Sequence, residues 1–247
     1  MKNPLVTPEK ISRWRAGTEI LMEMHSRKLD RHKVGGRLPY RLARSYQNAA
    51  FVEIADEKPQ VAINYLLASF KNMKLAWQEF MELKPENSES IADSRYSLLI
   101  RGMVVDQQAQ EDALSLFSAM RVHVQFPVFV TDFVEALSDI FEMKSEAAVN
   151  IQPTKDYPHM AGMANALLLR DKERFAEEVQ SSAESWLQYL KRDRGQTNSA
   201  CDLGGLAFTR LARRLHWTDF SPDHFLIPDC MLDVEPDRSF DFMLPKA

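Results

Sequence analysis

Residues 59–83, PQVAINYLLASFKNMKLAWQEFMEL, constrain the fold most, because their apolar side chains recur with the period of an α-helix. Proline suits the first helical position, so Pro59 marks the start. Bulky apolar residues then fall at i, i+3, i+4 and i+7, which places them on one face. They are Ile63, Leu66, Leu67, Phe70, Met73, Trp77, Phe80 and Met81. We expect a long amphipathic helix that buries this face against other helices.

The same period recurs along most of the chain and predicts an all-α fold. Thr7 and Pro8 are typical of a helix N-cap and first turn, and Asp171 is a second candidate cap. Further helices are expected at 8–33, 39–54, 89–105, 107–121, 131–144, 159–170, 172–190 and 199–216. We predict eight or nine helices packed as stacked hairpins or an irregular bundle.

One stretch departs from this helical pattern. Residues 122–130, VHVQFPVFV, are rich in β-branched and aromatic residues, which favour strands. Pro127 interrupts the run and is followed by a helical pattern, so a loop leading into a helix is favoured. A short strand at 122–126 stays open as the alternative.

Charge divides the chain unevenly. The net charge is −4, yet residues 1–44 hold eleven Lys/Arg against four carboxylates, so they carry +7 and the remainder carries −11. Nucleic-acid binding by the basic part is one interpretation. Packing of the basic helices beside acidic neighbours is the favoured one, because stacking aromatics are not interleaved there. We treat residues 1–247 as one domain with basic N-terminal helices at 8–56 and an acidic, apolar tail at 233–247.

Composition points to a globular chain in a reducing compartment. The sequence is 45% hydrophobic and 27% charged, with two cysteines and no run of about eighteen apolar residues. A cytoplasmic location is expected. No nucleotide-binding loop, zinc motif or nucleophile elbow occurs. We therefore expect no enzymatic activity and no cofactor.

Residues 216–230, HWTDFSPDHFLIPDC, concentrate polar side chains between two apolar segments. Ser221 followed by Pro222 predicts a new helix of about two turns, which Pro228 would end. A metal site made from His216, Asp219, Asp223 and His224 is the weaker alternative.

Two further patterns suggest chemistry only weakly. Cys201 precedes a helix start, where a thiolate paired with a histidine such as His159 is conceivable. A small core residue is the favoured interpretation of Cys201. Gly204 and Gly205 are expected to permit a close helix crossing.

Acidic residues gather toward the C-terminus. In the tail they alternate with Met231, Leu232 and later phenylalanines, a pattern that suits docking onto the body of the protein. The alternative is that the tail forms part of a surface for a basic protein partner, where the acids steer association and an aromatic side chain supplies an anchor. The candidate partner-binding residues are Asp219, Asp223, Asp229, Asp233, Glu235, Asp237 and Asp241.

The C-terminal half, residues 159–232, carries ANALLLRDKERFAEEVQ, SWLQYLKR, CDLGGLAFTRLARRLHW and DHFLIPDCMLD in that order. This order resembles the immunity protein 49 family of bacterial polymorphic toxin systems. The matching positions are Asp171, 205–207, 211–213 and 225–228, and Phe225 stands where the family has a tyrosine. Ile227 also lengthens the Leu-Pro spacing, and residues before 159 agree only in being helical.

The resemblance implies an all-α cytoplasmic protein that binds and neutralises a cognate toxin. It implies no catalytic residues, cofactor, small-molecule substrate or membrane, and by analogy the toxin could be a basic nuclease domain. The alternatives are a helical-repeat scaffold with a non-toxin partner, or a metal-dependent hydrolase.

Overall fold

The computed structural model describes residues 3–29, 37–83, 95–120, 151, 158–192, 200–220 and 222–239. Within these ranges every regular element is helical, which confirms the predicted all-α class. The α-helices are α1 (Pro8–Leu29), α2 (Arg37–Ala55), α3 (Pro59–Leu83), α5 (Arg95–Val105), α6 (Gln107–Met120), α8 (Pro158–Leu168), α9 (Lys172–Arg192) and α10 (Leu203–Arg214). A 3₁₀ helix, η2, spans Asp229–Met231. The stretch 122–126 and the predicted helix 131–144 lie outside the described residues.

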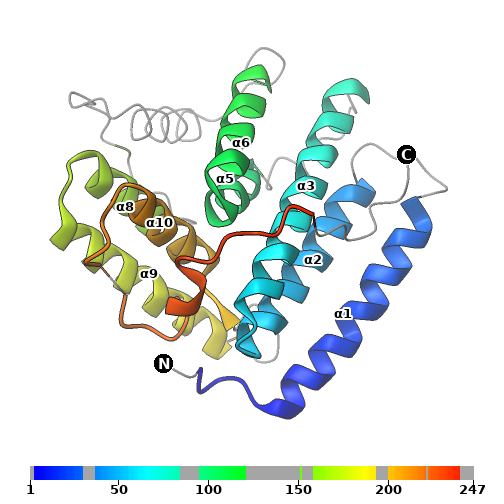
Figure 1. The fold of residues 1–247 in the computed structure, drawn as a ribbon, viewed down its shortest axis with the longest axis horizontal. Coiled ribbons are helices and arrows are strands. Elements are labelled where there is room, and N and C mark those ends of the chain that lie inside the picture. The colour runs from blue at the N-terminus through cyan, green and yellow to red at the C-terminus, as the bar shows by residue number, and fades with distance from the viewer. Residues whose placement is uncertain are drawn as a thin grey trace.

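Helices that follow one another pack as hairpins, α2 with α3, α5 with α6, and α8 with α9. Figure 1 shows α1 along one flank beside α2, then α3, α5 and α6 in the middle, with α8, α9 and α10 on the other flank. Helix α10 contacts α5 and so joins the two halves. Among the described residues, no helix is both long and apolar enough to cross a membrane.

The apolar face predicted for residues 59–83 is the centre of the core. Seven of its eight members are buried in α3, and Met81 packs partly buried against the same cluster. Trp77 and Phe80 meet edge to face, with ring centroids 5.6 Å apart. The helical period thus identified the inward face of α3 correctly.

The helix starts predicted at Thr7 and Asp171 are confirmed. Thr7 accepts a hydrogen bond from the Lys10 amide at 3.3 Å, and Asp171 accepts one from the Arg174 amide at 3.0 Å. Both satisfy backbone N–H groups that the first turn of a helix leaves open.

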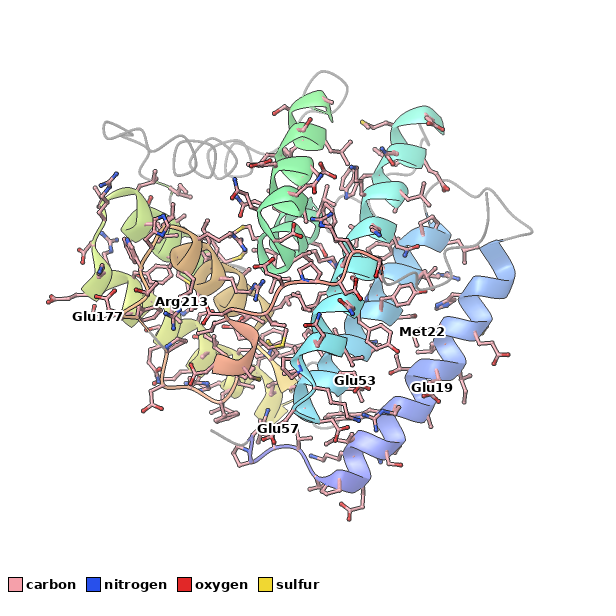
Figure 2. The ribbon with its side chains drawn as sticks, viewed as in Figure 1. Glu19, Met22, Glu53, Glu57, Glu177 and Arg213 are labelled. Atoms are coloured by element: carbon pink, nitrogen blue, oxygen red, sulfur yellow. The ribbon has the colours of Figure 1, made fainter. Side chains whose placement is uncertain are left out.

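The basic helix α1 packs beside acidic residues at the end of α2 and in the turn after it, as the charge pattern favoured. Arg15 donates to Glu53 from Nε at 3.1 Å and to Asp56 from Nη2 at 2.8 Å. Part of the positive charge of residues 1–44 is therefore neutralised within the protein. Figure 2 shows Glu53 facing α1 from the neighbouring helix.

Helix α5 approaches α6 closely at Gly102. A Cβ atom at this position would lie 2.7 Å from the Ala109 carbonyl oxygen and 3.1 Å from the Ala113 Cβ. The first atom belongs to a helix backbone and cannot yield easily. Gly102 is therefore required for the α5–α6 packing distance.

We predict that Gly102→Ala lowers the free energy of unfolding by about 1–3 kcal/mol, because the added methyl group overpacks the α5–α6 contact. Gly17→Ala is the matched control, since nothing lies within 4 Å of the corresponding Cβ on α1. There the helix propensity of alanine should raise stability by about 0.5–1 kcal/mol. Urea unfolding of both variants measures these values, and equal effects of the same sign would contradict the packing argument.

Candidate interaction surface

The chain leaves α10 through a turn rather than through the expected helix. The helix predicted after Pro222 is wrong, because the described residues 222–228 are not helical and contain only a turn at 225–226 and a bend at 227. The Asp202 amide donates to the Leu226 carbonyl at 2.8 Å, and the Leu226 amide donates to His224 Nδ1 at 3.2 Å. These bonds occupy backbone groups that a helix would need, so the contact with the start of α10 determines the local structure.

Residues 229–239, which we call the C-terminal strap, begin with the 3₁₀ helix η2 and then cross the molecule without further helix. The strap begins at η2, passes α10 and α5, and ends beside α3 (Figure 1). Met231 and Leu232 are buried in the main core, and Val234 packs against it. The prediction that apolar residues of the tail dock onto the body is confirmed for Met231 and Leu232, while Phe240, Phe242 and Met243 lie outside the described residues.

Arg210 holds the inner end of the strap. It lies on α10 with a relative exposure of 1%. Its Nη1 donates to the carbonyl oxygens of Met231 and, at 3.1 Å, Leu232. Its Nη2 donates to Val234 O at 2.8 Å and to Val105 O, at the end of α5, at 2.9 Å. One guanidinium thus links α10, α5 and the strap.

Burial lowers the pKa of Arg210, because the charged form loses its hydration, while Glu235 and Asp233 of the strap and Asp106 partly offset this shift. Glu235 Oε1 lies 3.7 Å from Nη2, although 67% of the Glu235 side chain is exposed. Four carbonyl oxygens accept hydrogen bonds from the guanidinium and replace part of the hydration that the buried charge loses.

The outer end of the strap is fixed by helices α3 and α6. Asn64 on α3 accepts a hydrogen bond from the Asp237 amide at 2.8 Å, and Gln60 donates to the Glu235 carbonyl at 3.0 Å. Arg238 forms an ion pair with Asp106, and Asp106 also caps α6 by accepting from the Ala109 amide at 2.7 Å.

The strap backbone is thus tied down while its carboxylates face outward. Asp229, Asp233, Glu235 and Asp237 are all exposed. Glu57, from the turn between α2 and α3, adds an acid near η2. Burial raises the pKa of Cys230, and the negative charges of Glu57 and Asp229 raise it further. Figure 2 labels Glu57 at this turn. Glu57 could not be predicted as part of this surface, because it is distant from the strap along the chain.

The remaining predicted acids lie elsewhere. Asp219 accepts two hydrogen bonds from Lys172 Nζ, each 2.9 Å, and this partner lowers the pKa of Asp219. The pair stands at the start of α9 and not on the strap. Asp223 is exposed within the turn after α10, and Asp241 lies outside the described residues.

The alternative metal site is not assembled. Among the described residues, no group of three or more His, Cys, Asp or Glu side chains could hold a metal ion. His224 is buried and stacks on Phe225 with centroids 4.7 Å apart, whereas His216 is exposed at a positive φ of 65°. Asp219 is engaged by Lys172 instead.

Cys201 is a core residue, as favoured. It is fully buried, and burial raises its pKa well above the ordinary value, so a thiolate is disfavoured. The neighbouring Asp202 caps α10 through the Gly205 amide at 3.0 Å. The close approach at Gly205 is to Asp202 and to Ile227, whose Cδ1 would stand 2.7 Å from a Cβ there. It is not the helix crossing that was expected.

Comparison with known proteins adds no functional assignment: no family model matches the chain, and no curated protein or solved structure matches it. The resemblance to the immunity protein 49 family therefore stays a prediction from the residues quoted above.

We predict that Arg210→Met lowers the free energy of unfolding by about 2–4 kcal/mol, because it leaves buried carbonyl groups without a donor. Arg174→Met is the control, since Arg174 is exposed on α9 and should change stability by less than about 0.5 kcal/mol. Chemical denaturation of the two variants measures the difference. Equal stability of both would show that Arg210 does not hold the strap.

Proposed function

We propose that the protein is an immunity-type binding protein that neutralises a cognate bacterial toxin by direct contact. The observation that carries the proposal is the C-terminal strap, a segment with fixed backbone and outward acids. The resemblance of residues 159–232 to the immunity protein 49 family supplies the toxin as the class of partner. The proposed location is the cytoplasm of the producing bacterium.

The arrangement of the strap suits binding for two physical reasons. Its backbone is held before a partner arrives, which reduces the entropy lost on association. Its carboxylates, with Glu57 nearby, create a negative region that attracts a basic protein and speeds encounter. A toxin domain with a positively charged active-site face, such as a nuclease, fits this chemistry.

A helical scaffold with a non-toxin partner is the second candidate. It is supported by the successive hairpins α2–α3, α5–α6 and α8–α9. The two proposals differ in the partner and in the biological effect of binding, so one experiment separates them.

That experiment is growth rescue with co-purification. The C-terminal domain encoded by the neighbouring large gene is expressed in bacteria with and without this protein. Restored growth together with a stable complex is the expected result. If both proteins are folded and neither rescue nor a complex is seen, this pairing is wrong and the scaffold proposal takes its place.

Within such a complex, we predict that the double variant Asp229→Asn, Asp233→Asn slows association about 10-fold at low salt and changes dissociation little. The matched control is Glu177→Gln, Glu82→Gln, which removes the same charge from exposed positions on α9 and α3. Figure 2 places Glu177 on the outer edge of α9, away from the strap. Stopped-flow binding at two salt concentrations measures both, and equal slowing by the control would mean that only net charge matters.

A further inference from the structure

His159 connects a serine and a glutamate of the neighbouring helix. Its Nε2 lies 2.9 Å from Ser185 Oγ, and its Nδ1 lies 3.2 Å from Glu178 Oε2. Glu178 and Ser185 are both on α9 and are separated by seven residues. Two helical turns span about 10.5 Å, so the imidazole from α8 fits between them on one face.

The chemistry of the three side chains fixes the direction of the hydrogen bonds. An ionised carboxylate only accepts, so Nδ1 carries the hydrogen and donates to Glu178. In the neutral imidazole, Nε2 is then the acceptor, and Ser185 Oγ donates to it. Serine, base and orienting carboxylate thus stand in the order that nucleophilic serine sites use.

Gly162 makes the position of Glu178 possible. A Cβ at Gly162 would stand 2.2–2.5 Å from the three carboxylate atoms of Glu178. The carboxylate therefore lies against the backbone of α8, one turn beyond His159. A methyl group at residue 162 would displace the Glu178 carboxylate without removing Ser185, His159 or Glu178 itself.

The surroundings of Ser185 are open and aromatic. Ser185 is exposed, and Tyr189, at i+4 on the same face, is 48% exposed and stacked on Trp186 with centroids 5.1 Å apart. The amino end of α8, which carries a positive partial charge, lies at His159. A flat, aromatic acyl donor could rest on the aromatic pair next to the hydroxyl.

We propose that Ser185, His159 and Glu178 form a nucleophilic serine site that accepts acyl groups from small aryl esters. This inference goes beyond the binding function proposed above and does not depend on it. Ser185 Oγ bonds to the acyl carbon as its proton passes to His159 Nε2. His159 then returns that proton to the departing aryl oxygen as the ester C–O bond breaks.

Hydrolysis of the acyl-serine completes the reaction. A water molecule gives one proton to His159 Nε2 while its oxygen bonds to the acyl carbon. The bond between the acyl carbon and Ser185 Oγ then breaks. His159 passes the proton back to Ser185 Oγ, and the carboxylic acid leaves. Glu178 keeps the imidazole oriented throughout and exchanges no proton.

The test uses the full chain, a fluorophosphonate that phosphonylates activated serines with loss of fluoride, and p-nitrophenyl acetate as the ester. Peptide mapping by mass spectrometry is expected to place the phosphonate on Ser185. Ser185→Ala should abolish labelling and ester turnover, and His159→Gln should reduce both about 100-fold. Gly162→Ala, which displaces only the carboxylate, should reduce both by a smaller factor.

Ser181→Ala is the matched control, because it removes a different hydroxyl of α9 and should leave labelling and turnover unchanged. Circular dichroism confirms that each variant remains helical. No labelling of folded wild-type protein would overturn the proposal. Labelling of Ser185 that persists undiminished in His159→Gln would also overturn it, since the histidine would then not activate the serine.

Discussion

The structure depends on one buried guanidinium, that of Arg210. This side chain reaches from α10 to the end of α5 and to three carbonyl groups of the strap. An uncompensated buried charge would cost several kcal/mol, so the surrounding carbonyl groups must keep their positions. The carbonyl groups in turn require the guanidinium, because they are buried or half-buried and need a hydrogen-bond donor.

Arg101 is a second buried arginine that donates to neutral acceptors, in the other half of the fold. It is 3% exposed and donates to Ser69 on α3, to the Ser97 carbonyl on α5 and to Gln47 on α2. Burial lowers the pKa of Arg101 to about 10, so the group remains charged at neutral pH. Arg214, whose pKa burial also lowers to about 10, donates to Met103 and Gln110. Fixed neutral acceptors, more than carboxylates, therefore hold these arginines between helices.

Local sequence signals predicted the helices well and their connections poorly. The apolar period of α3 and the caps Thr7 and Asp171 depend on neighbours in the chain, so they could be identified without a structure. The Ser-Pro-Asp signal at 221–223 has the same local form as a helix start. The Asp202–Leu226 hydrogen bond, which joins residues distant in sequence, overrides it.

The candidate sites, like the fold, could be predicted from the sequence only where the signal is local. Alternating acids and apolar residues in the tail predicted a docked segment, but Glu57 joins its surroundings only through the fold. Arg210 stands among other basic residues in FTRLARRL and shows no local sign of burial. Ser185 and His159 are 26 residues apart and match no motif, so only helix packing brings them within hydrogen-bond distance.

Hydrogen exchange along the C-terminal strap tests the central claim, that Arg210 and α3 hold this segment in place. The Leu232 and Asp237 amides donate to Asp229 O and to Asn64 Oδ1. In the intact protein they should exchange at least about 100-fold more slowly than amides of an unstructured peptide. Exchange of both at the unstructured rate, while α10 amides stay protected, would show that the strap is not fixed and would contradict the account.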